Sequence, residues 1–562
     1  MKKFRIGPVI AGLLAAAVVV LIGTFGLMTP LNLKSRGFWL MIIITFAVFL
    51  AVRRLALGFK DFGRVKITRR TKKGRRVEFN KFNVNFKPYI LLVLLVAVFI
   101  VLSIAGSTVF NASKYASVLT VTDADFSKDI SESVGTDSIA LMDTASAKML
   151  GDREIGSLSN VVSQFNVSDD YTQIDYRGKP VKVSALGYAG FFKWINNKDS
   201  GVVGYVTVDP VSMSAEFTEY GSMKYVPSAY FFENAERHLW LKYPTLLLGS
   251  VHFEIDESGK PYYIAPIYKR TVFLFGGTTV SGCVALDPVT GETQKYDVGD
   301  IPQWIDVVFD GDLICEQYNW YGRYQNGFLN SLIGKKGCKQ VTTYLNGDEA
   351  TDDDDSVPTS DYGYVSKDQD IWIYTGVTSL NGDSSNIGFL FANERTGEAH
   401  YFNIAGADEK SAMTAAEGEV QEKGYQASFP SLISVASKPT YIMVLKDSGG
   451  LVKLYAAVNV EQYNIVATAD TQKECLRKYR AKLGLAANDT PTAETKSVTA
   501  VIEAIRYIDI DGNTYIYLIT KKGEIYKAKA SEHEEMLLLK EGDTVTLECS
   551  GGLITDFKKN EK

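Results

Sequence analysis

The sequence predicts an α+β protein that three N-terminal helices hold in a membrane. Three observations lead to this prediction. Long uncharged apolar runs lie near the N-terminus, the two parts of the chain carry opposite net charges, and a helix followed by strands recurs along residues 114–485. Helices combined with antiparallel strands in this way are typical of the α+β class. Short strands end the chain, so we expect a small all-β domain there.

Three apolar runs predict the membrane domain, residues 1–113. A spanning helix needs ~20 apolar residues, and the runs give spans of about 7–28, 37–57 and 88–110. The second run has only 16 uncharged residues. It spans if the charged ends of Arg53 and Arg54 reach toward the membrane surface.

The connection between the second and third spans predicts the topology. Residues 53–87 contain 13 Lys and Arg residues, and loops this basic lie on the cytoplasmic side. We therefore expect a plasma-membrane protein with a cytoplasmic N-terminus and an extracytoplasmic C-terminal domain. The cluster also suits anionic lipid headgroups, but a topology signal is the simpler interpretation.

The charge balance limits the partners. Residues 1–108 carry a net charge of +16, and the remaining 454 residues carry −21. An acidic domain repels polyanions, so we expect no nucleic-acid partner.

The five cysteines are Cys283, Cys315, Cys338, Cys475 and Cys549. None stands in a CxxC or similar spacing, so the sequence predicts no metal site and no cofactor. One disulfide within the stretch from Cys283 to Cys338 is an alternative, but core thiols fit the sparse, odd number better.

An internal repeat organises the extracytoplasmic part. The segment from Ile174 to Pro180 recurs 81 residues later from Ile255, and Gly204 to Pro210 recurs 78 residues later from Gly282. The order is kept and the offset barely drifts, which indicates a duplicated module. A capped helix precedes the strands of each copy: residues 144–150 after Asp143, and 229–242 after Ser228.

A hairpin signature closes the second copy, with Asp287, Thr290, Gly291 and Glu292. A weaker copy follows with Asn393, Thr396, Gly397 and Glu398. In the first copy Met213 stands where the glycine would be, so we expect a different turn there.

A helix followed by strands and this hairpin resembles PepSY-type extracytoplasmic modules, and the whole chain resembles three-span bacterial surface proteins. The PepSY resemblance implies an envelope module that binds or regulates other proteins, and it implies no chemistry. Five short strands after residue 497 resemble an OB-like barrel.

These patterns give the expected domain boundaries. They are 114–225 for the first module, 226–303 for the second, 304–369 for an aromatic and acidic insertion, 370–485 for third and fourth module-like units, 486–497 for a linker, and 498–562 for the small barrel.

Two acidic segments resemble calcium loops only superficially. Residues 509–513 lack the ligand spacing of such a loop and fit a hairpin turn better. The run 352–355 fits a solvated loop, because adjacent carboxylates do not converge on one ion. The four histidines, including His252, fall in no catalytic motif. A pair of His252 with Cys283 is conceivable only if the fold brings them together, so we expect no enzyme.

The best candidate binding segment runs from Tyr318 to Phe328. Its aromatic rings alternate with amide and guanidinium groups, which suits a protein partner or a cell-wall glycan. The candidate residues are Trp320, Tyr321, Arg323 and Tyr324. The alternative, which we prefer, is a loop whose rings fill the gap between modules.

The sequence therefore predicts a non-enzymatic, membrane-anchored binding, scaffold or regulatory protein of the cell envelope. Its partners would be other envelope or membrane proteins. The alternative is an accessory subunit of a membrane transport or secretion complex. In its favour, Gly12, Ala15–Ala17 and Gly23 are small enough for close helix packing.

Overall fold

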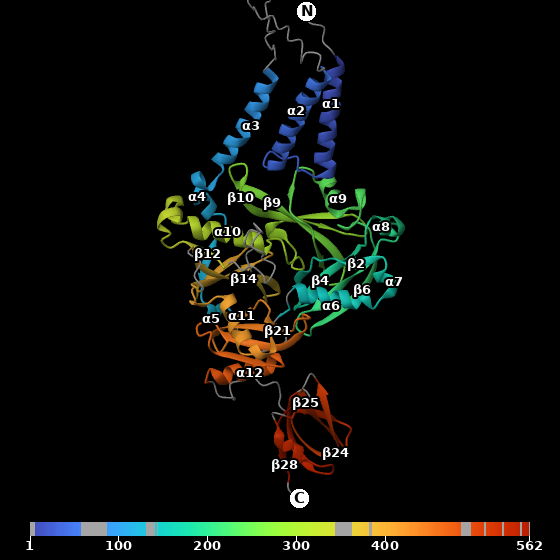
Figure 1. Cartoon of the computed structure of the whole chain (residues 1–562), viewed down its shortest axis with the longest axis vertical. Coiled ribbons are helices and arrows are strands. Elements are labelled where there is room, and N and C mark those ends of the chain that lie inside the picture. Colours follow the sequence, from blue (N-terminus) through green and yellow to red (C-terminus); the bar gives the residue numbers. More distant parts are fainter. Residues whose placement is uncertain are drawn as a thin grey trace, which may run out of the picture. The chain divides into compact units, whose positions relative to one another are not determined.

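The computed structural model divides the chain into two compact units, residues 1–484 and 485–562. The structure describes residues 6–57, 87–130, 141–142, 144–342, 362–380, 385–484, 496–510, 513–530, 533–550 and 553–560. It confirms the mixed α and β composition and the apolar N-terminal helices (Figure 1).

The first membrane helix, α1 (Ile6–Leu21), continues as one π-helical turn, η1 (Ile22–Gly26), and the second is α2 (Arg36–Ala56). Both are long and apolar enough to cross a membrane, which supports membrane anchoring. Glycines set their distance, because a Cβ on Gly12 would lie 2.9 Å from Phe49 and one on Gly23 would lie 2.6 Å from Met41. These small residues therefore serve contacts within the chain.

The third apolar helix, α3 (Lys87–Ala105), ends earlier than predicted. It bends by 45° into α4 (Thr108–Ala116), and the pair counts as a third span only if the two helices are taken together. The Asn111 side chain donates to the carbonyl of Ala105 at 2.6 Å, and Tyr115 donates to that of Gly106 at 2.8 Å. These bonds satisfy carbonyls that the end of α3 leaves free. Most of the basic connection lies outside the described residues.

Four modules, each a helix followed by one antiparallel sheet, form the rest of the first unit. Module 1 (residues 144–223) contains α6 (Thr144–Gly156), α7 (Ser159–Val162), β2 (Phe165–Val167), β3 (Thr172–Tyr176), β4 (Lys179–Tyr188), α8 (Phe191–Asn197), β5 (Val202–Asp209) and β6 (Ser214–Met223). Module 2 (235–297) contains α9 (Ala235–Lys242), β7 (Leu247–Leu248), β8 (His252–Ile255), β9 (Pro261–Val272), β10 (Gly276–Leu286) and β11 (Thr293–Asp297).

The other two modules also begin with a helix that strands follow, and module 4 ends with a further helix. Module 3 (311–402) contains α10 (Gly311–Tyr324), η6 (Asn330–Gly334), β12 (Lys339–Val341), β13 (Gly363–Lys367), β14 (Asp370–Ser379), β15 (Ser385–Asn386), β16 (Gly388–Asn393) and β17 (Ala399–Phe402). Module 4 (409–482) contains α11 (Glu409–Gly418), β19 (Gln426–Ala427), β20 (Ser431–Val435), β21 (Lys438–Lys446), β22 (Val452–Asn459), β23 (Val466–Ala469) and α12 (Gln472–Lys482), with β18 (Gly406–Ala407) just before it.

All four sheets share one pairing pattern. Two short strands pair with the same long strand, which pairs on its other side with the next strand, and that strand pairs with the last one. The long strands are β4, β9, β14 and β21. An added parallel strand, β1 (Val121–Ala124), pairs with β17, so the sheet of module 3 has six strands.

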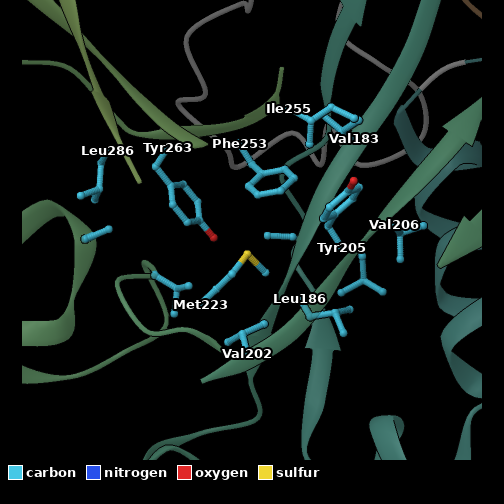
Figure 2. Close-up of a cluster of buried hydrophobic side chains, with 14 of the residues drawn as sticks. Val183, Leu186, Val202, Tyr205, Val206, Met223, Phe253, Ile255, Tyr263 and Leu286 are labelled. Carbon is cyan, nitrogen blue, oxygen red and sulfur yellow. The ribbon is translucent and has the colours of Figure 1, made fainter. Parts of the chain in front are cut away.

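The sheets stack, and most are buried on both faces. In β14, Ile373 faces the core shared with module 2, whereas its neighbours Trp372 and Tyr374 face the core shared with module 4. Successive strand residues point to opposite faces, so one strand serves two cores. Between modules 1 and 2, Phe253 and Tyr263 face Tyr205 across the shared core (Figure 2).

The hairpin before the last strand corrects one sequence prediction. In module 2 the Asp287 side chain accepts hydrogen bonds from two backbone N–H groups, and Gly291 has φ of +73°. Module 1 makes the same turn with Asp209, and Met213 adopts φ of +58°. The expected different turn is wrong, because the side-chain cap holds a non-glycine residue in the left-handed region.

Two helix predictions also differ from the structure. The helix of module 2 begins at Ala235 with Asn234 as its N-cap, after the 3-10 turn η4 (Phe231–Glu233), rather than at Ala229 after Ser228. Residues 311–324, placed by the sequence in a loop of the 304–369 insertion, form α10, in the same place within its module as α9 and α11. Helix α6 begins at Thr144 as expected, although Asp143 lies outside the described residues.

The second unit is a small β domain of five strands: β24 (Lys496–Ile510), β25 (Asn513–Thr520), β26 (Ile525–Lys529), β27 (Thr544–Ser550) and β28 (Leu553–Lys559). The pairing order is β24-β25-β26-β28-β27, and β27 returns to β24. The pairing of β26 with β28 rests on one residue pair. Residues 509–510 pair with 513–514 as a hairpin, as predicted.

Candidate functional site

A cavity of about 480 Å³ lies between modules 1 and 2. Its walls come from α6, β2 and β4 on one side and from the start of module 2 on the other. The lining residues are Lys148, Asp152, Asn166, Val167, Ser168, Asp169, Asp170, Ala185, Leu186, Gly187, Tyr188, Pro227, Ser228, Val251, His252, Phe253 and Tyr263. Cavities of this size between structural units are common ligand sites.

A fixed histidine lies in this wall. The Nε2 atom of His252 is 2.9 Å from Oε1 of Glu254, which is fully buried. The backbone N–H groups of Asp306 and Val307 donate to the same carboxylate at 2.9 and 3.0 Å. These bonds hold Glu254, and Glu254 in turn fixes the orientation of the His252 ring.

The opening of the cavity is acidic. Asp152, Asp169 and Asp170 are exposed there. Lys148 forms an ion pair with Asp169, and this contact raises the pKa of Lys148. Lys148 balances one of the three negative charges, so Asp152 and Asp170 leave a surplus of negative charge at the opening. The cavity therefore favours a ligand that carries positive charge.

Behind His252, buried acids join three modules. The carboxylate of Asp306 accepts a hydrogen bond from the backbone of Asp175 at 2.8 Å, and Ser366 donates to Asp175 at 2.9 Å. Burial, together with the charge of Glu254, raises the pKa of Asp306 well above its usual range. Burial also raises the pKa of Glu394. Burial thus favours the neutral form of both carboxyl groups.

Two residues with nucleophilic side chains, Ser228 and Cys283, lie in or near modules 1 and 2. The hydroxyl of Ser228 accepts a hydrogen bond from the backbone of Tyr188 at 3.0 Å. Burial raises the pKa of Cys283 to about 12, which keeps it as an unreactive thiol at neutral pH. Among the described residues, the hydrogen bond of the His252 ring goes to Glu254 and none joins it to Ser228 or Cys283.

The described part of the chain contains no group of three or more His, Cys, Asp or Glu side chains arranged to hold a metal ion. All five cysteines are free and buried, so the core-thiol interpretation is confirmed. The acidic run 352–355 lies outside the described residues.

The aromatic residues predicted as a binding surface lie on and near the C-terminal half of α10. Trp320 is half-buried and packs edge-on against Tyr115 of α4, with ring centroids 4.9 Å apart. Tyr321 is half-buried beside the fully buried Tyr318. Arg323 is exposed and donates to Gln340 at 2.8 Å. Trp320 thus joins the membrane-proximal helix α4 to module 3, as Figure 1 shows for the two helices.

Tyr324, the last residue of α10, is half-buried and stacks on Phe328 with ring centroids 6.2 Å apart. Arg323 and the exposed parts of the three half-buried rings are left for a partner. Whether they bind one stays a prediction.

The sequence did not single out the residues of the cavity, except for His252. A local signal existed: His252 and Glu254 stand two apart on one strand, so both point to the same face. The acids at the opening gave no such signal, because Asp152 lies on α6 and Asp170 lies between β2 and β3.

No protein-family model matches the chain, and no curated protein matches it. Among solved structures, a levansucrase variant from B. megaterium aligns over 81% of this chain and 94% of its own length, at 10% sequence identity and a TM-score of 0.17. This score is too low to indicate a shared fold, so the functional argument rests on the site.

Proposed function

We propose that the chain is a membrane-anchored binding protein of the cell envelope whose cavity between modules 1 and 2 takes an amine-bearing group. The group would belong to an envelope protein or to a cell-wall polymer. The observation that carries the proposal is the cavity of about 480 Å³ with surplus carboxylates at its opening and His252 held by Glu254.

The ligand class follows from charge. A primary amine donates three hydrogen bonds and carries one positive charge. Asp152 and Asp170 supply acceptors at the opening, and the Tyr263 hydroxyl and His252 lie further along the wall. An anionic ligand would meet unpaired carboxylates, which costs affinity.

The finer sequence expectations belong to the same proposal. The shared strand pairing of four sheets supports tandem copies of one module, resembling PepSY-type modules. Five strands support the OB-like resemblance of the second unit. The bent pair α3–α4 supports a third span. With the basic loop inside, the modules would lie outside the cytoplasm.

The test uses the full chain in lipid nanodiscs, with spermidine and lysine amide as cationic probes and acetate as the anionic probe. All six tryptophans precede residue 373, so tryptophan fluorescence reports thermal unfolding of the first unit. We expect the amines to raise the melting temperature of wild type, because a ligand that binds only the folded state stabilises it.

The variant Asp152→Asn/Asp170→Asn should lose this shift. The matched control, Asp199→Asn, removes an exposed acid of module 1 that does not line the cavity and should keep it. Stabilisation by acetate alone, or an equal loss of the amine effect in the control, would refute the proposal.

The alternative, an accessory subunit of a transport or secretion complex, is favoured by α3. Residues 89–105 of this helix, for which the structure describes burial, are all exposed or half-buried, so a partner helix has room beside it. Replacing the membrane helices by an unrelated anchor distinguishes the two functions. A binding protein keeps amine binding at the cavity, whereas a complex subunit no longer co-purifies with its complex.

A further inference from the structure

Exposed aromatic side chains gather where the modules meet the membrane helices. We name Phe191, Phe192, Tyr230, Phe231 and Phe232 the aromatic collar. Phe192 is 78% exposed and Phe232 is 64% exposed. Ring contacts link the collar: Phe191 lies 5.0 Å from Tyr230 and 5.8 Å from Phe192. A patch of large exposed rings on a folded domain marks an interaction surface.

The collar is continuous with the first membrane helix. The ring centroids of Phe25 and Phe232 are 5.5 Å apart. The guanidinium of Arg237 lies 4.7 Å from the ring centroid of Phe25, and it donates to the carbonyls of Phe25 at 3.1 Å and Phe231 at 2.9 Å. Nearby, the indole of Trp240 donates to the carbonyl of Thr29 at 3.1 Å. These contacts fix the collar beside the end of the helix.

The length of this helix sets the depth of the collar. Residues Ile6–Gly26 number 21, and a rise of 1.5 Å per residue makes the helix about 30 Å long, equal to the hydrocarbon core of a bilayer. Phe25, one residue from its end, therefore lies at the boundary between hydrocarbon and headgroups. Phe232, in contact with it, lies at the same depth.

Backbone conformation supplies an independent observation. Phe231 has φ of +53°, which is rare for a bulky residue. The residue is 52% exposed although its ring lies 5.8 Å from that of Trp194, so this conformation keeps a large aromatic residue at the surface. A second phenylalanine repeats the pattern: Phe273, in the turn between β9 and β10, has φ of +54° and is 50% exposed.

Phe273 also lies at the membrane end. A Cβ built on Gly106, just after α3, would lie 3.5 Å from the Cβ of Phe273. Its neighbour Phe275 contacts rings of two membrane helices, Trp39 at 6.5 Å and Phe99 at 5.6 Å between centroids. Phe273 is therefore placed at the end of α3, as the collar is placed at the end of α1 and η1.

We propose that the aromatic collar and Phe273 insert into the lipid interface of the leaflet on the side of the modules. The occupant is the boundary between headgroups and acyl chains, where aromatic side chains concentrate in membrane proteins. Burying apolar rings there removes their exposure to water and fixes modules 1 and 2 against the bilayer. This inference requires only the membrane anchoring.

The experiment places a spin label on single cysteines in the full chain, reconstituted in phosphatidylcholine–phosphatidylglycerol vesicles. The variants are Phe232→Cys, Phe192→Cys and Phe273→Cys, and the matched control is Tyr463→Cys, a 56% exposed aromatic residue of module 4. The native cysteines are all buried, so unmodified wild type gives the labelling background. Collision rates with oxygen, which enters lipid, and with a water-soluble nickel chelate report the surroundings of each label.

We expect the ratio of oxygen to nickel collisions to be several-fold higher at the three membrane-end positions than at position 463. Equal ratios would overturn the proposal, because the rings would then face water. Low collision rates with both reagents would also overturn it, because a protein would then cover the surface. Phe192 is the most exposed of these residues, so a label there leaves the fold intact even if another variant fails to fold.

Discussion

The stacked modules and the terminal β domain use similar short strands but bury them differently. In β14, residues 370–378 are all buried, because one sheet separates two cores. In β24 of the second unit, buried Ala500 and Ile502 alternate with half-buried Val501 and exposed Glu503. In a sheet with one buried face, every second residue packs against the core and the residues between them face solvent. In the stack, nearly every residue is constrained, so a change in one sheet acts on two modules.

The largest effect is expected for a ring at the centre of the stack. Phe391 on β16 is 1% exposed and contacts the rings of Tyr374 and Phe402. Phe391→Ala should lower the free energy of unfolding of the first unit by about 3–5 kcal/mol, because it leaves a cavity. Tryptophan fluorescence measures this loss in the full chain in detergent.

Hydrogen exchange at β27 in the same sample measures the second unit. It should stay unchanged, because this strand belongs to a separate compact unit. Loss of protection in β27 at the same midpoint would show that the two regions unfold together.

The next effect concerns a buried charge in the stack. Burial raises the pKa of Glu409 to about 7. Its carboxylate accepts bonds from Gly376 at 2.6 Å and Thr342 at 3.2 Å. Because the pKa is raised on folding, the protonated form is the stabilised one. The stability it contributes is fully present below the unfolded pKa of about 4.5 and is lost as pH rises to about 7, by about 3 kcal/mol.

Glu409→Gln should remove this loss, since an amide can accept from Gly376 and donate to Thr342. We expect the difference in unfolding free energy between variant and wild type to grow in favour of the variant from pH 4.5 to 7 and then level off. Urea unfolding at several pH values measures it. A difference independent of pH would contradict the buried, protonated carboxyl.

A smaller effect separates two aromatic rings in the C-terminal half of α10. Trp320→Ala should cost about 2 kcal/mol, because the ring fills the contact with Tyr115 of α4. Tyr324→Ala should cost about half as much, because in the described part of the chain the ring pairs with Phe328, four residues away. Arg323→Ala is the exposed control. If Trp320→Ala leaves the melting temperature unchanged but removes a partner, the predicted binding surface regains support.

The smallest effect is a gain. The turn between β20 and β21 places Ala436 at φ of +52° and Ser437 at +59°. Asn-Gly is the preferred pair in such turns, so Ala436→Asn/Ser437→Gly should stabilise the first unit by about 1 kcal/mol. The matched comparison is Arg177→Asn in the equivalent turn of module 1. There a single substitution completes the Asn-Gly pair, because Gly178 is already present. A destabilised double variant would mean that the native side chains make contacts that outweigh the backbone strain.

Local chemistry explains how far the fold could be predicted. The hairpins at Asp287 and Asn393 were predictable, because a side-chain oxygen and a glycine define the turn within five residues. Helix α10 was not, because its rings and Asn319 are weak helix formers, and burial of Tyr318 between sheets decides its structure. The prediction for the turn at Met213 was wrong for a related reason. The side-chain cap of Asp209 holds Met213 in the left-handed region, which the intrinsic preference of methionine disfavours.

The cavity was beyond prediction for a different reason. Its lining spans residues 148–263 and combines elements of two modules. The contact of Lys148 with Asp169 depends on how α6 lies on its own sheet, and the burial of Glu254 depends on the distant backbone of Asp306 and Val307. Sequence periodicity shows which face of a strand is apolar but not which surface it meets.

During synthesis, strand β1 is made long before the strand with which it pairs. It lies just after the membrane helices, yet its partner β17 follows 278 residues later, from Val121 to Ala399. At ribosomal speeds of ~5–20 residues per second, the first strand waits on the order of tens of seconds before its partner exists. During that interval an unpaired strand edge sits beside the membrane and can pair with a wrong neighbour. Strand β1 can form its correct pair only when the third module is complete. A nascent chain stopped before residue 399 should therefore depend most strongly on chaperones.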